Sequence, residues 1–413
     1  MLLTFIALAI VASLLFEIWL DQRQIRHVLA HRERVPAAFH DAVSLEDHQK
    51  AATYTAAKRR FGIKRDVAGA ILGFVLLVAG GFAFIHGMVV AALGTGYIAS
   101  LALVASIVLI GGLVSLPFDY LETFSIEAKF GFNRSTRKLF AIDLVKSVAL
   151  TILFMTPLVL AVDYAMRQLG SWWWLAVWGI FVAFNVLALL IVPTFILPLF
   201  NKLEPLEDAA LKTRIAALME RCGFRARGVF RMDGSKRSSH GNAFFTGFGP
   251  SKRIVLFDTL MEKLTPDEIE AVLAHELGHF KLRHITKRII VYFGISLAVL
   301  AFLGWLTDQA WFYRGFGIDP AMAKAMPLTS LLLFFLVFPL ISKWFRAISS
   351  HFSRLHEFEA DHYATQHASA KELASALIKL HRDNASTLTP DPIYSAVNDS
   401  HPSAAQRIAR LAA

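Results

Sequence analysis

The most restrictive feature of this sequence is an apolar run at residues 67–118 that contains no Lys, Arg, Asp or Glu. About 20 apolar residues are enough for one helix to cross a bilayer, so this run is long enough for two crossings. Gly94, Thr95 and Gly96 interrupt it, and this composition suits a tight turn. The run therefore predicts a helical hairpin within a membrane.

The composition of the whole chain supports the same class. A length of 413 residues could form two or three soluble domains, but 55% hydrophobic residues, 18% charged residues and a mean hydropathy of +0.51 indicate a polytopic membrane protein. The first apolar stretch has no basic residue before it and no small-residue cleavage site after it, so we expect it to remain as an anchor. About seven stretches are long enough to cross: 2–20, 67–92, 97–118, 139–162, 172–198, 289–307 and 325–342.

The distribution of charge predicts the orientation of these helices. Among the short connections, Lys and Arg are concentrated at residues 21–66 and 119–146, which marks those loops as cytoplasmic and the N-terminus as external. With an odd number of crossings, the soluble segment and the C-terminal tail both lie in the cytoplasm. We expect membrane helices with basic loops over 1–198, a small α+β unit over 199–288, two further membrane helices over 289–342 and a helical tail over 343–413.

The soluble segment ends with the motif HELGH, in a stretch that carries helix start signals. Thr265 can cap the helix and Glu268 can complete a capping box. Residues four apart share a helix face, so His275 and His279 can direct a ring nitrogen at one Zn²⁺ ion per chain. Glu276, the next residue, would then flank the attacking water. This is the HExxH arrangement of zinc hydrolases.

Two histidines leave a zinc site short of its usual three protein ligands. A metzincin would place Gly at 282 and His at 285, but Leu282 and Ile285 stand there, which excludes that class. His284 would lie on the opposite side of a continuous helix, so we expect it in a solvated or membrane-surface position.

A better source of the third ligand lies downstream, in EFEAD. Glu357 and Asp361 are four apart on a predicted helix, so Glu357 could bind zinc while Asp361 orients a ligand histidine. Glu359 would point elsewhere on that helix. His356 and His362 remain alternative ligands, and a solvated charged helix is the alternative for the whole stretch.

The segment before HELGH predicts an α+β unit. Residues 207–222 have an amphipathic helical pattern, and residues 227–232, 242–248 and 253–258 have the composition of short strands, with a hairpin turn at 247–252. A sheet edge beside a metal could pair with an extended peptide. An ordinary hairpin packed on a helix is the alternative.

The net charge of +10 suggests a basic surface against anionic lipid, because no nucleic-acid-binding motif accompanies it. We therefore expect membrane lipids as partners and no nucleic acid. The single cysteine, Cys222, cannot form an internal disulfide and is expected to be a small buried residue.

Several stretches resemble the CAAX prenyl protease 1 family, integral-membrane zinc endopeptidases of the gluzincin type related to heat-shock-type membrane proteases. The similar stretches are GFNRST at 131–136, SSHGNAFFTGF at 238–248, KRIVLFDTL at 252–260, HELGHFKLRH at 275–284, EFEAD at 357–361 and YSAVNDSHPSAAQRI at 394–408. The resemblance implies a seven-helix barrel around a water-filled chamber. It also implies roles for seven side chains: His275, His279 and Glu357 as zinc ligands, Glu276 as the catalytic glutamate, Asn242 and His401 as contacts to the scissile peptide, and Asp361 as the partner of a ligand.

The family name implies removal of the last three residues from a prenylated CAAX protein or peptide. The chain shows no ER retrieval signal and has minimal outward loops, which favours a bacterial inner membrane over the ER membrane of a eukaryote. A membrane-protein quality-control protease is therefore a second hypothesis. Glu17 and His86 lie within apolar stretches, as they would in a transporter, but a transporter or a non-catalytic scaffold would leave HELGH and EFEAD unexplained.

The predicted orientation can be tested by thiol labelling in intact cells. Cysteines introduced at Thr95 and Gln168 should react with an impermeant reagent from outside, because both lie in short external connections. A cysteine within residues 199–288 should react only after permeabilisation. The reverse pattern would place the soluble unit outside.

Overall fold

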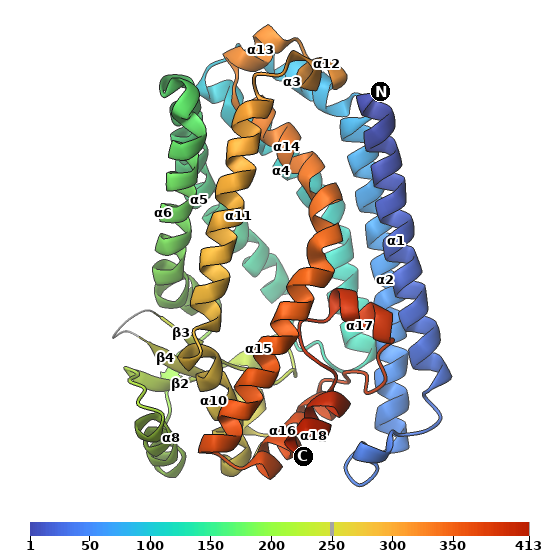
Figure 1. Ribbon diagram of the computed structural model, residues 1–413, viewed down its shortest axis with the longest axis vertical. Coiled ribbons are helices and arrows are strands. Elements are labelled where there is room, and N and C mark those ends of the chain that lie inside the picture. Colours follow the sequence, from blue (N-terminus) through green and yellow to red (C-terminus); the bar gives the residue numbers. More distant parts are fainter. Residues whose placement is uncertain (248–251, 413) are drawn as a thin grey trace.

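The protein is described by a computed structural model that covers residues 1–247 and 252–412. Long helices form a ring at one end of the molecule, and a compact unit of short helices and strands closes the other end (Figure 1). The fold is therefore mainly α with a small sheet, as predicted. In the described residues six helical segments are long and apolar enough to cross a membrane, and a bent pair of helices would make a seventh. The ring helices are α1 (Leu2–Ala30), α2 (Leu45–Leu77), α4 (Tyr97–Leu121), α5 (Arg137–Gln168), α6 (Trp173–Ile191), α11 (His284–Leu306) and α14 (Leu328–Ser342).

The bent pair corrects one predicted element. The expected single helix at 67–92 is broken: α2 ends at Leu77 and α3 (Gly81–Leu93) continues at an angle of 54°. Gly80 has a φ of +83°, and a Cβ at Gly81 would lie 2.7 Å from the carbonyl oxygen of Val75, so two glycines permit the break. After the turn at Gly94, α3 packs against α4 as the predicted hairpin requires.

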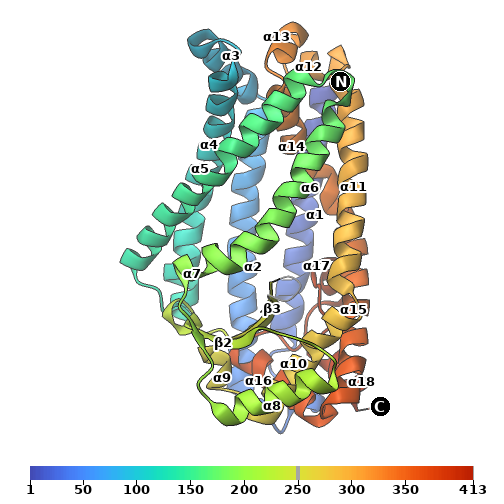
Figure 2. The ribbon, with the colours of Figure 1, turned by 90° about the vertical axis from the view of Figure 1, so that its left-hand side faces the viewer.

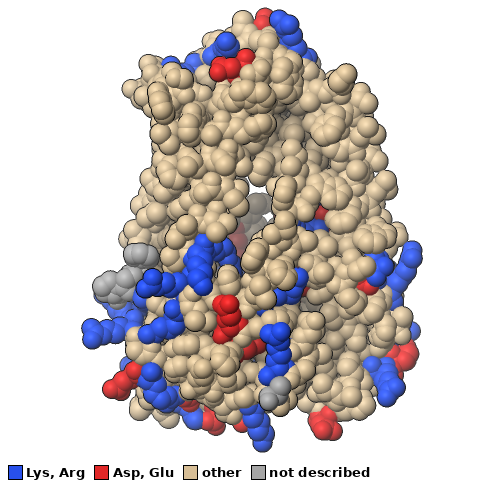
Figure 3. All heavy atoms as spheres, viewed as in Figure 1, with Lys and Arg blue, Asp and Glu red and all other residues tan. Residues whose placement is uncertain are grey.

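The ring helices do not share a packed core along their length. In the most apolar window of each crossing segment only 6–28% of the residues are buried, so each helix packs mainly against its neighbours. Packing is dense at the end remote from the sheet, where buried side chains of α3, α4, α11 and α12 (Ala310–Gly315) meet. Side chains that represent this cluster are Phe82, Leu103, Leu303 and Phe312. Figure 3 shows an opening in the wall between the helices, and Figure 2 shows the ring from the side.

The soluble unit contains a four-stranded sheet in the order β1-β2-β4-β3. The predicted strands are present as β2 (Gly228–Met232), β3 (Ala243–Thr246) and β4 (Arg253–Phe257), and β1 (Leu203–Pro205) was not predicted. β3 runs antiparallel to β4 at the edge of the sheet, whereas β2 and β4 are parallel. Most of the predicted turn at 247–252, and the end of the predicted strand at residue 248, lie outside the described residues.

The sheet packs on α8 (Ala209–Arg221) and on α10 (Pro266–Lys281), the helix that carries HELGH. Thr265 and Glu268 form the predicted capping box. Buried Leu218, Ile254 and Leu273 belong to this core, and Cys222 is buried beside them, as expected. This packing fixes α10 on a rigid support.

The second site helix, α15 (Arg346–His367), continues almost directly from membrane helix α14 through residues 343–345. It packs along α10, and the closest approach is at Gly278, where a Cβ would lie 3.1 Å from both Cα and the carbonyl oxygen of Ala360. The chain then ends with α16 (Ala370–Asp383), α17 (Pro392–Asn398) and α18 (Ala404–Leu411). Glycine at 278 therefore permits the distance between the two site helices.

Replacing Gly278 with Ala should push α10 and α15 apart. We expect a loss of about 1–3 kcal/mol of folding free energy, as for other overpacked sites, together with weaker metal binding. Gly294→Ala is the matched control, because a Cβ there meets nothing within 4 Å and should be neutral or stabilising. Thermal unfolding and metal titration in detergent measure both effects. Equal behaviour of the two variants would contradict this role for Gly278.

Candidate metal centre

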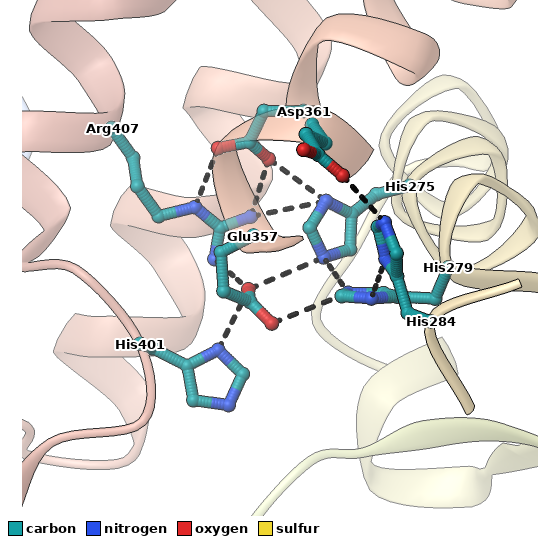
Figure 4. A network of polar contacts seen from close by, with 8 residues as sticks. His275, His279, His284, Glu357, Asp361, His401 and Arg407 are labelled. Carbon is teal, nitrogen blue, oxygen red and sulfur yellow. Dashed lines mark hydrogen bonds and ion pairs between the residues drawn. The ribbon is translucent and has the colours of Figure 1, made fainter. Parts of the chain in front are cut away.

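Three side chains from two helices converge at one point below the ring. His275 and His279 project from α10 and Glu357 projects from α15 (Figure 4). The Nε2 atoms of His275 and His279 are 3.2 Å apart, and they lie 3.5 Å from Glu357 Oε2 and 3.2 Å from Glu357 Oε1, respectively. Around a tetrahedral ion with donor distances of about 2.0–2.2 Å, donor atoms lie about 3.4 Å apart. The three donors therefore have the spacing of ligands to one metal ion.

The contacts of His275 and His279 indicate that the Nε2 atom of each ring presents a lone pair toward the same point. His275 Nδ1 lies 2.8 Å from a carboxylate oxygen of Asp361, so the ring proton is on Nδ1 and Nε2 is an acceptor. Glu357 is 4% exposed, and its Oε2 lies 2.7 Å from Nδ1 of His401 and 3.5 Å from Nη1 of Arg407. Its Oε1 instead faces Nε2 of His279, which in turn faces Nε2 of His275. Buried acceptors that face one another in this way are unfavourable unless a cation lies between them. The group therefore fits a metal ion.

Asp361 and Arg407 support His275 from behind. Arg407, from α18, donates from Nε to Asp361 Oδ2 at 2.8 Å and from Nη2 to Asp361 Oδ1 at 2.5 Å. Both residues are buried. Burial alone would lower the pKa of His275, but the neighbouring carboxylates of Asp361 and Glu357 outweigh that effect and raise this pKa. Sequence reasoning missed Arg407, although a buried Asp361 required a cationic partner.

His401 lies on the solvent side of the same group. It lies between α17 and α18, its side chain is 64% exposed, and its Nδ1 is 2.7 Å from Glu357 Oε2. Glu276 is half-buried on α10 between the two histidines. Asn242 precedes edge strand β3; its carbonyl accepts from Phe257 and its side-chain oxygen accepts from the amide of Ala243 at 2.8 Å.

The expectation for His284 was wrong. His284 is fully buried, and its Nδ1 lies 3.0 Å from Nδ1 of His279. Its Nε2 lies 2.8 Å from Glu359 Oε2, so Glu359 pairs with His284 and is not one of the three metal donors. The reason is a break in the helix: Arg283 has a φ of +58°, and His284 starts α11 instead of continuing α10.

A HELGH helix and a carboxylate-bearing helix that meet at the end of a ring of membrane helices define an integral-membrane metallopeptidase. The chain belongs to the CAAX prenyl protease 1 group of peptidase family M48. A profile described as "Peptidase family M48" matches residues 205–413, and one described as "CAAX prenyl protease N-terminal, five membrane helices" matches residues 24–202.

Curated relatives and a solved structure support this assignment over nearly the full length. CAAX prenyl protease 1 of Saccharomyces cerevisiae is 34% identical over 97% of this chain and 93% of its own length. A CAAX prenyl protease 1 homolog of Arabidopsis thaliana is 33% identical, with coverage of 95% and 93%. The crystal structure of S. mikatae Ste24p superposes with a TM-score of 0.91 at 33% identity and covers 100% of this chain and 99% of that chain.

The buried pair of Arg407 and Asp361 should be needed for stability. Arg407→Leu leaves Asp361 buried without its cation, so we expect a loss of about 3–5 kcal/mol in unfolding free energy. Adding Asp361→Asn to Arg407→Leu should recover part of that loss. Arg410→Leu, on the same helix, removes only an exposed guanidinium stacked on Phe358 and should cost about 0.5–1 kcal/mol. Similar losses for Arg407→Leu and Arg410→Leu in denaturant titrations would contradict the pairing.

Proposed function

We propose that this protein is a zinc-dependent endopeptidase that cleaves near the C-terminus of prenylated CAAX-type peptides or proteins. The observation that carries the proposal is the triangle of donor atoms from His275, His279 and Glu357. Two histidines and one carboxylate are a typical donor set for catalytic zinc, which keeps its fourth position open. Similarity to CAAX prenyl proteases over nearly the whole chain supports the substrate class.

When bound, zinc would act as a Lewis acid that polarises the scissile carbonyl and acidifies a water molecule. Glu276 would accept the proton of the attacking water and later donate it to the leaving amine. Asp361 would keep the proton of His275 on Nδ1, so that Nε2 stays available to the metal. Each of these roles uses a side chain already directed by α10 or α15.

His401 and Asn242 would hold the peptide. His401 is mostly exposed and its Nδ1 faces Glu357. As an imidazolium, with a proton on each ring nitrogen, it could donate from Nδ1 to Glu357 and from Nε2 to the carbonyl oxygen as negative charge develops. Asn242 is exposed at the start of β3, a strand whose outer edge can pair with an extended substrate. Main-chain pairing accepts almost any side chain, so sequence specificity would come from other contacts.

We also propose that the soluble unit faces the cytoplasm and that anionic lipids contact its basic rim. Lys and Arg gather around this half of the molecule in Figure 3, and Lys281, Arg283 and Lys287 are exposed where α10 leads into α11. Basic residues at this level favour an anionic membrane surface. The bacterial inner membrane is the location we favour, with the ER membrane as the eukaryotic equivalent.

The proposal is tested with purified protein, a farnesylated CAAX peptide and the same peptide without the prenyl group. We expect one zinc per chain by elemental analysis, cleavage of the farnesylated peptide, and loss of cleavage with chelator that zinc restores. Glu357→Ala should lose the metal. Equal cleavage of both peptides would favour a quality-control protease, and chelator-resistant cleavage would exclude the metal mechanism.

Glu276→Gln should keep zinc but lose turnover by about 100- to 10,000-fold, because the amide preserves shape and cannot accept the proton. Glu262→Gln, at an exposed position after α9 (Asp258–Met261), is the control for loss of one carboxylate. Zinc content and kcat are measured for both. Turnover near wild type in Glu276→Gln would remove this residue from the mechanism.

His401→Ala should lower kcat by about 100- to 1,000-fold with normal zinc content, as expected for loss of one donor to a developing oxyanion. Asn242→Ala should raise KM as well as lower kcat, because it would contact the peptide before and during attack. His362→Ala, an exposed histidine of α15, is the control. Unchanged kcat and KM in both test variants would refute this model of the substrate site while leaving the zinc site intact.

A further inference from the structure

The two ligand histidines have different partners at their second ring nitrogen. His275 donates to Asp361, whose charge is balanced by Arg407. His279 instead meets another imidazole, because its Nδ1 lies 3.0 Å from Nδ1 of His284. Both partners, Asp361 and His284, are buried, so each contact is part of the packed interior.

The positions of the protons follow from the contacts. Nε2 of His279 faces Glu357 Oε1 and Nε2 of His275, both at 3.2 Å, so Nε2 is the metal-binding atom and the proton lies on Nδ1. That proton can be accepted only if Nδ1 of His284 is unprotonated. His284 then carries its proton on Nε2, which lies 2.8 Å from Glu359 Oε2. The three residues form one directed chain of hydrogen bonds that ends at a carboxylate.

A break in the helix brings His284 next to His279. On a continuous helix His284 would lie about 180° around from His275, but α10 stops at Lys281 and Arg283 adopts a left-handed conformation that residues other than glycine rarely adopt. His284 thereby becomes the first residue of α11 and is fully buried. Its ring stacks on His356 of α15 with centroids 4.1 Å apart and an interplanar angle of 10°.

We propose that His284, supported by Glu359, is a positioning residue that fixes the ring and tautomer of the metal ligand His279. The inference rests on the zinc site proposed above and assigns to His279 the support that Asp361 gives His275. Partners of this kind keep a ligand in place, and their loss typically weakens metal binding by about 10- to 100-fold. The chain of hydrogen bonds from His279 through His284 ends on Glu359, whose side chain is 53% exposed. A carboxylate in contact with solvent needs no buried cation to balance its charge, whereas the buried Asp361 needs Arg407.

The test compares two substitutions that differ only in an acceptor. His284→Leu fills the space without an acceptor, whereas His284→Asn places a carbonyl oxygen where Nδ1 stood. Zinc affinity is measured by competition with a chromophoric chelator, and ligand geometry by the visible spectrum of the Co²⁺-substituted protein. We expect about 10- to 100-fold weaker zinc binding and an altered spectrum for His284→Leu, and recovery of most of both by His284→Asn. His356→Leu removes the stacked ring but no hydrogen bond to His279, and should bind zinc as wild type does.

Wild-type affinity in His284→Leu, or equal loss in His284→Leu and His284→Asn, would overturn the proposal, because the acceptor would then not matter. His284, His356 and Glu359 are themselves close enough to hold an ion. If the wild-type protein bound two zinc ions per chain, and both His284→Leu and His356→Leu lost one of them, the proposal would also be overturned. If His284→Leu does not fold, Glu359→Ala decides the question: it should weaken zinc binding, and unchanged affinity would refute the chain of hydrogen bonds. Failure of the zinc site itself would appear differently, as wild-type protein without zinc.

Discussion

The metal centre depends on the contact between α10 and α15, two helices separated in sequence by two membrane crossings. α11 leaves α10 directly, and α14 runs into α15 almost without interruption, so the two crossings return the chain to the side on which it started. Glu357 can reach the histidines only if both crossings have the right length and the helices meet closely. The approach at Gly278 permits that meeting, because a Cβ at this position would lie only 3.1 Å from backbone atoms of Ala360.

The metal centre also contains buried carboxylates, and their negative charges must be balanced. Glu357 and Asp361 are both buried, and unpaired buried charges are costly, so Arg407 and a bound cation are needed together. Arg407 and His401 come from the end of the chain. That end is tied to the first helix by Arg23, which binds Asp391 of the α17 cap at 2.9 Å. The C-terminal segment that contributes Arg407 and His401 to the site is therefore also anchored to α1.

Patterns of local origin could be predicted from the sequence, and contacts between distant segments could not. The capped HELGH helix and the strand that became β4 follow from residues next to one another. The break after Leu282 has no glycine or proline to announce it, so His284 was placed on the wrong face. Arg407 was missed for a related reason: its partner lies on another helix, and an arginine on an amphipathic helix has no local sign of burial.

The distribution of polar groups along the ring explains how a hydrolase can work from within a membrane. Apolar packing dominates the end remote from the sheet, where Asp163 and Arg167 of α5 form an ion pair, and further ion pairs lie on helices nearer the metal centre. Glu17 of α1, an acid inside an apolar stretch, pairs with Arg346 of α15 at 2.9 Å, and Lys58 of α2 lies 3.2 Å from Glu127. Ionisable groups at membrane depth are tolerated where they pair or face a polar interior. An apolar end and a polar, metal-binding end are together what the proposed substrate requires, because a prenylated peptide joins an apolar chain to a backbone that must meet water.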